Sequence, residues 1–464
     1  MNLSIVDKVY FIGIGGIGMS ALARYFKSQG KRVGGYDKVE TTLTKSLIKE
    51  GIEVQYDTTT TPEWILSDIN ETVLVVYTPA IPETNQQLID FRKNGYNLFK
   101  RAEVLGFITQ NAFTIAIAGT HGKTTTATLL AHILRSAGMD CTAFLGGISN
   151  NYNTNLLIAE KGNIVVVEAD EYDRSFLHLK PDIAVITSVD NDHMDIYSDT
   201  ADLQTTFQDF ARKVKPNGTL IVNKSIDIAF DIPENGSFYT YSSELKADYR
   251  AFNLQIIEGK QYFDAQIIDV LPGEIHEQNT TGIAIKLPGR HNVENAVASI
   301  VVACQLGLEC SKILQSISSF KGVKRRFDTH VEGKHIYIDD YAHHPEELNA
   351  TLQAVSTLYP KRFTTVVFQP HLYSRTRDFA DDFAKALSGV DELILLEIYP
   401  AREKPIQGVT AEMLLKKIQS ASKSVKTKEA LLEDLKNKKR ELLLTLGAGD
   451  IDQLVEPIKA LYHR

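Results

Sequence analysis

The sequence has few cysteines, no long apolar run and no excess of positive charge, and each shortage excludes a class of protein. Its three cysteines, Cys141, Cys304 and Cys310, fit neither a disulfide framework nor the ligand spacing of a metal site. No apolar run reaches the roughly 18 residues that a membrane-spanning helix needs. The formal net charge of −8 argues against nucleic-acid binding, because such surfaces are basic. We therefore expect a cytoplasmic protein that binds neither membrane nor nucleic acid.

Three stretches of the chain each begin with an apolar strand, a sharp turn and an amphipathic helix, which is typical of parallel α/β domains. At 464 residues the chain also exceeds the size of one hydrophobic core. We predict an α/β protein of three domains. These are a Rossmann-like domain at 1–106, a central domain with a P-loop ATPase-like parallel sheet at 107–321, and a Rossmann-like domain at 322–464. Alternating apolar residues near 245–287 predict a small antiparallel subsheet in the central domain.

A glycine-rich loop follows the strand predicted at 113–118 and precedes a helix with one apolar face. Backbone N–H groups at such a helix start bind phosphate, Lys123 adds positive charge, and Thr124 can bind a metal ion. Ile117 stands where the Walker A pattern has its first glycine, so the loop is shorter than that pattern. The predicted ATP-binding residues are Gly119, Thr120, His121, Gly122, Lys123, Thr124 and Thr125.

Two further strands of the central domain end near residues that suit Mg²⁺. Glu168 ends the strand at 164–167, and His193 follows the strand at 183–186 after a short turn. Because the carboxyl ends of parallel strands line one edge of a sheet, Thr124, Glu168 and His193 can converge on one metal ion. Magnesium prefers oxygen ligands, whereas histidine is an uncommon partner for it. The alternatives are a solvated acidic turn at 168–173 and a hydrogen-bonding loop histidine.

A second glycine turn, GIGGIG at 13–18, lies between the first strand and a helix predicted at 19–29. The pattern G-x-G-x-x-G holds a diphosphate at a helix N-terminus, and Asp37 follows about 20 residues later, at the end of the next strand. NAD is the ordinary ligand of this pattern, with the acidic residue on a ribose hydroxyl. A UDP-sugar fits it equally well. The glycines could also serve only close helix packing.

Five motifs together resemble the Mur ligase family, and they cover nearly the whole chain. They are GTHGKTTT at 119–126, EADE at 168–171, DHMD at 192–195, GRHNVENA at 289–296 and DDYAHHP at 339–345. Within the family, FQPHLYSRTRD at 368–378 and the N-terminal glycine turn resemble members that add L-alanine to UDP-N-acetylmuramate. Members that attach a ready-made tripeptide share some motifs but differ around 178–181 and 369–377.

The resemblance implies an enzyme of peptidoglycan synthesis with UDP-N-acetylmuramate, L-alanine and ATP as substrates, Mg²⁺ as cofactor, and a monomeric or weakly dimeric state. It implies that the first domain binds the UDP part through Gly13, Gly15, Gly16, Gly18, Asp37, Thr78 and Ala80. It adds His291, Asn292 and Asn295 to the ATP site. It implies an amino-acid site lined by Asp340, His343, His344, His371, Arg375 and Arg377.

The candidate catalytic residues are Lys123, Glu168, His193, Arg325, Arg326 and His344. A carboxylate and an amine do not condense unaided at neutral pH, so the implied route forms an acyl phosphate from ATP, which the amine of alanine then attacks. Lys123 and Mg²⁺ would supply the positive charge, and His344 could take a proton from the ammonium group. Arg325 and Arg326 could instead form a solvated junction, and His344 could simply start a helix. Alternatives from other classes are an NAD-dependent oxidoreductase and a non-catalytic nucleotide switch.

Overall fold

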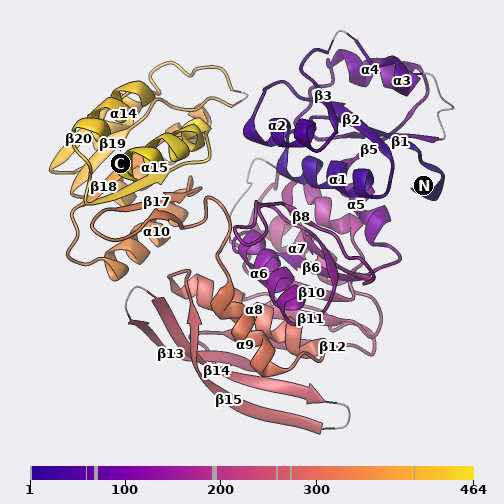
Figure 1. The fold of residues 1–464 in the computed structure, drawn as a ribbon. Helices are drawn as coiled ribbons and strands as arrows, with labels where there is room; N and C mark the ends of the chain where they lie inside the picture. Colours follow the sequence, from indigo (N-terminus) through magenta and orange to yellow (C-terminus); the bar gives the residue numbers. More distant parts are fainter. Residues whose placement is uncertain are drawn as a thin grey trace. The chain divides into compact units, whose positions relative to one another are not determined.

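The chain forms two compact units in a computed structural model that describes residues 3–58, 60–66, 72–190, 196–257, 260–271, 274–401 and 403–463. Unit 1 comprises Met1–Leu254, Tyr262–Ala284 and Arg290–Lys321, and unit 2 comprises Gln255–Gln261, Ile285–Gly289 and Gly322–Arg464. The described residues contain a five-stranded, a ten-stranded and a six-stranded sheet (Figure 1). No helix in these ranges is long and apolar enough to cross a membrane.

The first sheet of unit 1 is parallel, with the strand order β3-β2-β1-β4-β5. Its strands are β1 (Lys8–Ile12), β2 (Arg32–Tyr36), β3 (Glu53–Gln55), β4 (Val73–Tyr77) and β5 (Asn97–Lys100). Its helices are α1 (Ile17–Ser28), α2 (Thr42–Lys49), α3 (Glu63–Leu66), α4 (Gln86–Lys93) and α5 (Arg101–Thr109). The central strand β1 is fully buried from Val9 to Ile12, and its end delivers the glycine turn to one edge of the sheet.

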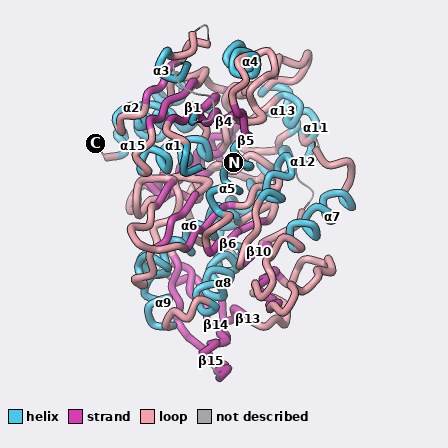
Figure 2. Tube along the Cα trace, turned by 90° about the vertical axis from the view of Figure 1, so that its right-hand side faces the viewer, coloured by secondary structure: helices cyan, strands magenta, loops and turns pink. Residues whose placement is uncertain are grey.

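The second sheet of unit 1 has the order β15-β14-β13-β12-β11-β10-β6-β9-β7-β8. Its strands are β6 (Phe113–Ala118), β7 (Cys141–Phe144), β8 (Leu156–Leu157), β9 (Ile164–Glu168), β10 (Ile183–Ile186), β11 (Thr219–Asn223), β12 (Ser237–Ser242), β13 (Tyr249–Ile257), β14 (Lys260–Leu271) and β15 (Glu274–Ile285). Its helices are α6 (Lys123–Ser136), α7 (Thr200–Ala211), α8 (Arg290–Gln305) and α9 (Cys310–Ser319). Helices α6 and α8 pack against each other (Figure 2). Strands β13 to β15 extend the central sheet, so the predicted subsheet is continuous with it.

The two sheets of unit 1 share one hydrophobic core, which joins Val9 and Phe11 of β1 to Phe144 and Val167 of the central sheet. A buried amide also crosses this junction. The Asn155 side chain donates to the carbonyl oxygen of Ile17 at 2.6 Å and to Ser20 Oγ at 2.9 Å. The ends of both sheets are therefore held in a fixed relation, which is what a site built from both of them requires.

The sheet of unit 2 has the order β16-β17-β21-β18-β19-β20 and is parallel except for β16. Its strands are β16 (Asp328–Val331), β17 (Ile336–Asp340), β18 (Thr364–Phe368), β19 (Glu392–Leu395), β20 (Ser422–Val425) and β21 (Leu442–Leu446). Its helices are α10 (Pro345–Leu358), α11 (Tyr373–Asp378), α12 (Ala380–Leu387), α13 (Ala411–Lys417), α14 (Lys428–Asn437) and α15 (Val455–Tyr462). Alternate residues of β21 enter two cores, with Leu442 and Leu444 on one face and Leu443 on the other.

Candidate active site

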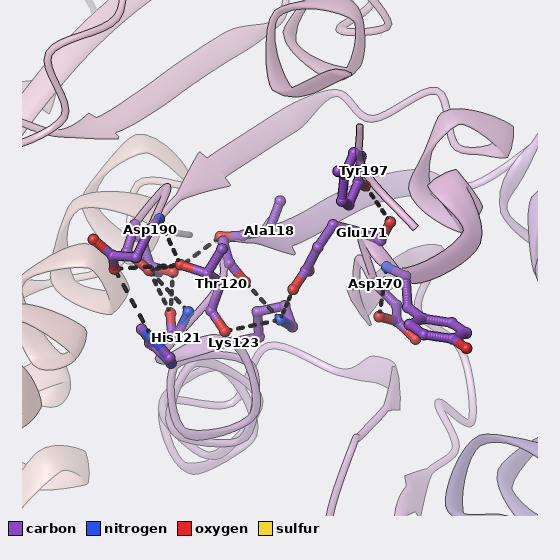
Figure 3. A network of polar contacts seen from close by, with 12 residues as sticks. Ala118, Thr120, His121, Lys123, Asp170, Glu171, Asp190 and Tyr197 are labelled. Atoms are coloured by element: carbon purple, nitrogen blue, oxygen red, sulfur yellow. Dashed lines mark hydrogen bonds and ion pairs between the residues drawn. The ribbon is translucent and has the colours of Figure 1, made fainter. Parts of the chain in front are cut away.

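The glycine-rich loop lies between β6 and α6, as the sequence predicts, and its glycines are required by its geometry. Gly119 and Gly122 have φ of +135° and +84°, a region that glycine enters without strain. A Cβ at Gly119 would also lie 2.1 Å from Thr187 Oγ1. The segment after β10 is hydrogen-bonded to the loop: His121 N donates to Ser188 Oγ at 2.8 Å, and Asp190 N donates to Thr120 Oγ1 at 3.0 Å (Figure 3).

Lys123 begins α6 and is the cation of this loop. Its Nζ donates to Gly119 O at 2.6 Å and forms an ion pair with Glu171 Oε1 at 2.8 Å (Figure 3). The Glu171 side chain is 0% exposed, and that of Lys123 is 12% exposed. Burial alone would lower the pKa of Lys123, but the carboxylates of Glu171, Asp170 and Glu168 raise it above its usual value. Lys123 therefore keeps its positive charge despite its burial.

Glu168 ends β9 and is the metal-ligand candidate with the clearest structural support. Its Oε2 is buried and has no hydrogen-bond partner among the described residues. Gly146 leaves room for the carboxylate, because a Cβ there would lie 2.0 Å from Oε2. Thr124 is buried in the first turn of α6, and His193 lies outside the described residues. No group of three or more His, Cys, Asp or Glu suited to a metal occurs in the ranges described.

A cavity of about 440 Å³ in unit 1 connects the N-terminal glycine turn with the edge of the central sheet. Most of the residues predicted to bind the UDP part line it, namely Gly13, Gly16, Gly18, Asp37, Thr78 and Ala80. The central sheet contributes Gly146, Glu168 and Asp170. Gly15, the remaining glycine of the turn, stabilises the turn, because its N–H donates to Asp37 Oδ2 at 2.7 Å. One oxygen of Asp37 therefore holds the turn, in addition to any contact with a ligand.

Helix α8 carries the three residues that the resemblance adds to the ATP site, and it contacts the glycine-rich loop through Asn295. A Cβ at Gly122 would lie 2.6 Å from Asn295 Oδ1, so this amide lies directly against the loop. Asn295 Nδ2 donates to Asn292 Oδ1 at 3.4 Å, and both residues are buried. His291 is exposed in the first turn of the same helix.

In unit 2, Asp340 and Glu347 organise several residues of the predicted amino-acid site. Asp340 accepts hydrogen bonds from Phe327 N and Ala342 N, each at 2.7 Å, and burial raises its pKa to about 6. Glu347 Oε2 accepts from the backbone N–H groups of His343 at 2.9 Å and His344 at 3.2 Å. His344 is the N-cap of α10, and its ring packs against Phe379.

The remaining predicted residues of unit 2 are half-buried, except Arg377, which is exposed. Arg325 has φ of +62°, and its Nε pairs with the buried carboxylate of Asp339 at 3.0 Å. Arg326 is more exposed and lies 3.8 Å from Glu347 Oε1. His371 stacks on Tyr399 and lies 5.9 Å from the His343 ring. Arg375 is half-buried in α11, whereas Arg377 is exposed and pairs with Asp378 at 2.7 Å.

Comparison with known proteins identifies the family. The chain matches three domain families in order: "Mur ligase family, catalytic domain" at residues 8–112, "Mur ligase middle domain" at 117–303 and "Mur ligase, glutamate ligase domain" at 325–449. It is 49% identical to a UDP-N-acetylmuramate–L-alanine ligase of Cytophaga hutchinsonii, across 99% of this chain and 98% of the relative. The chain belongs to the Mur ligase family. Another Mur ligase of the same name, from Flavobacterium johnsoniae, is 47% identical across 100% of this chain and 99% of its own.

A solved Mur ligase structure has the same architecture. The UDP-N-acetylmuramate–alanine ligase of Thermotoga maritima superimposes with a TM-score of 0.78 and 26% identity, covering 98% of both chains. A murein peptide ligase of Psychrobacter arcticus gives a TM-score of 0.68 at 20% identity, over 98% of both chains, which shows the shared fold alone. The predicted family and the predicted three-domain α/β architecture are both confirmed.

Three residues of this Mur ligase site are not predicted by the sequence pattern. In the sequence Glu171 is only one member of an acidic run, yet in the structure it is the ion-pair partner of Lys123. Arg101 lines the cavity at the start of α5, directly after the short edge strand β5, which the sequence pattern does not predict. Gly146 has no motif around it, and only its contact with Glu168 shows why it is glycine.

Proposed function

We propose that this Mur ligase joins L-alanine to the muramyl carboxylate of UDP-N-acetylmuramate and converts ATP to ADP and phosphate, as a step in peptidoglycan precursor synthesis. The observation that carries the proposal is the cavity, which begins at a glycine turn suited to a diphosphate and ends at Glu168, beside the phosphate loop of Lys123. The names and full-length coverage of the relatives support the same reaction.

The proposed reaction has two steps. A carboxylate oxygen of the substrate attacks the γ-phosphorus of ATP, ADP leaves, and an acyl phosphate forms. The amine of alanine then attacks the acyl carbon, and phosphate leaves with the electron pair of the broken C–O bond. Lys123 neutralises charge on the phosphate oxygens in the first step. His344 is our candidate to take the proton from alanine, together with an amino-acid site of Asp340, His343, His371, Arg375 and Arg377.

Mg²⁺ fits the chemistry of the residues near the loop. The buried Oε2 of Glu168, which has no hydrogen-bond partner in the part of the chain that the structure describes, is an acceptor that a hard cation would satisfy, and the Thr124 hydroxyl lies on the first turn of α6. We propose that Thr124 and Glu168 hold the metal, with His193 as a further candidate. When bound, Mg²⁺ supplies positive charge to phosphate oxygens.

ADP release tests the proposed function. The full chain is assayed with ATP, Mg²⁺ and UDP-N-acetylmuramate, with or without L-alanine, glycine, L-serine or the tripeptide. We expect sustained ADP release with L-alanine and little without an amino acid. Faster release with the tripeptide would favour the recycling type of ligase. Sedimentation of the same sample tests the proposed monomer or weak homodimer.

Lys123→Ala separates the two substrate sites. We expect product formation to be abolished while UDP-N-acetylmuramate still binds, because Lys123 does not line the cavity. Loss of that binding would contradict the assignment of the UDP part to the first domain. Lys215→Ala is a matched control, because this lysine also forms a 2.8 Å ion pair in unit 1 but lies away from the loop.

A further inference from the structure

Two adjacent carboxylates after β9 hold cations that belong to different parts of the site. Asp170 Oδ2 lies 3.1 Å from Arg101 Nη2, and Glu171 Oε1 lies 2.8 Å from Lys123 Nζ. Arg101 lines the cavity, and its side chain fills the space beside Gly18, where a Cβ would lie 2.5 Å from Nη1. Lys123 belongs to the phosphate loop. One short segment, residues 170–176, therefore contacts both candidate substrate sites.

The backbone of this segment is strained and held from several sides. Asp173 and Arg174 both have φ of 53°, a left-handed conformation that residues with a Cβ rarely adopt and that persists only when surrounding contacts enforce it. The Arg174 guanidinium donates to both carboxylate oxygens of Asp202 at 2.9 Å and to Thr206 Oγ1 at 2.7 Å. These bonds fix the end of the segment to α7.

Hydrogen bonds inside the segment connect its two carboxylate residues to this fixed end. Arg174 N donates to Glu171 O at 2.9 Å, and Phe176 N donates to Asp170 O at 2.9 Å. The Tyr197 hydroxyl donates to Glu171 O (Figure 3). The Phe176 ring stacks on Phe210 with centroids 4.6 Å apart. Asp170 and Glu171 are therefore both tied by backbone hydrogen bonds to the fixed end of the same segment.

We propose that Asp170 and Glu171 are positioning residues that couple binding of the UDP substrate to binding of the nucleotide, an inference that rests on the proposed function. Each anionic ligand draws a cation away from the same strained segment. The first ligand releases part of the restraint, so the second ligand meets a cation that is held less tightly. The coupling is therefore positive, and thermodynamic linkage requires it to be equal in both directions.

Calorimetric titration of the full chain measures this coupling. A non-hydrolysable ATP analogue with Mg²⁺ is titrated with and without saturating UDP-N-acetylmuramate, and then the reverse titration is made. We expect UDP-N-acetylmuramate to tighten analogue binding at least about fivefold, within the usual range of coupling between sites, and the reverse titration to give the same factor. A factor near one, or weaker binding, overturns the coupling. If UDP-N-acetylmuramate does not bind at all, the proposed function fails with it.

Two variants test whether Asp170 carries the coupling. Asp170→Asn should bring the factor close to one, and Arg101→Gln should do the same from the other side of the pair. Asp173→Asn is the matched control: it breaks the exposed ion pair between Asp173 and Lys100, which spans the same two sheets, and asparagine tolerates the left-handed conformation. It should keep the wild-type factor. An unchanged factor in both Asp170→Asn and Arg101→Gln, or an equal loss in Asp173→Asn, overturns the proposal.

Discussion

Replacing Lys123 by methionine should destabilise unit 1 as well as stop turnover, because the fully buried carboxylate of Glu171 loses its ion-pair partner. In the variant, Glu171 must remain buried as a charge or take up a proton. Protonating a carboxyl group whose ordinary pKa is 4.5 costs about 1.4 kcal/mol for each pH unit above that value. At about pH 7.5 the cost is therefore about 4 kcal/mol, which sets an upper limit on the loss of stability from this cause.

The pH dependence identifies the cause. In the folded variant the buried Glu171 would have a raised pKa. The variant therefore loses no stability from this cause below pH 4.5, and it loses progressively more as the pH rises above that value. At about pH 5.5 the limit falls to about 1.4 kcal/mol. The double variant Lys123→Met/Glu171→Gln has no charge to neutralise and should be more stable than Lys123→Met at pH 7.5. Urea unfolding followed by the fluorescence of Trp64, the single tryptophan, reports on unit 1.

Lys215→Met is the control for this measurement. Its 2.8 Å pair with Asp182 has the same length, but the two side chains are 30% and 23% exposed. Water can solvate Asp182 after the change, so the expected loss is at most about 1 kcal/mol. Equal losses for Lys123→Met and Lys215→Met, or a Lys123→Met loss that does not change between pH 5.5 and 7.5, would refute the reasoning.

Three further substitutions test other parts of the structure. Gly146→Ala puts a methyl group 2.0 Å from Glu168 Oε2, so turnover should fall and the Mg²⁺ concentration for half-maximal ADP release should rise. Burial raises the pKa of Asp340 from 3.8 to about 6, so its protonated carboxyl group stabilises unit 2 fully below pH 3.8, and this contribution disappears as the pH rises to about 6. The free energy of unfolding of Asp340→Asn, measured by denaturation followed by circular dichroism, should therefore rise relative to that of the wild type by up to about 3 kcal/mol over this pH range. Asn155→Ala removes three hydrogen bonds across the sheets of unit 1, to Ile17 O, Ser20 Oγ and the Arg24 guanidinium, and should cost about 1.5–4.5 kcal/mol in the Trp64 assay.

Apolar strands followed by turns and helices made the α/β architecture predictable. The strands expected at 113–118 and 183–186 are β6 and β10, with the same bounds. Strands β3 and β5 were missed, because they are short edge strands and β3 carries only one apolar residue, Val54. Local pattern is weakest at such edges, where pairing with a neighbouring strand decides the conformation.

The phosphate loop was predictable because its chemistry is local. Gly119, Gly122, Lys123 and Thr124 all lie within one turn and the start of one helix. The partner of Lys123 was not predictable in the same way. Glu171 is 48 residues away, in an acidic run whose members look alike in the sequence. Only the backbone after β9 decides which carboxylate faces which cation.

That backbone gives three neighbouring carboxylates different environments, and this difference bears on how an acidic protein can bind two polyanions. The net charge is −8, and the cations Arg101 and Lys123 each lie against a carboxylate. An anionic ligand must therefore compete with Asp170 or Glu171 at close range, and distant attraction contributes little. Glu168 differs, because its Oε2 has no such partner among the described residues. The same acidic run thus restrains two cations and leaves one carboxylate available, so a single turn can link recognition of anions to the binding of a metal ion.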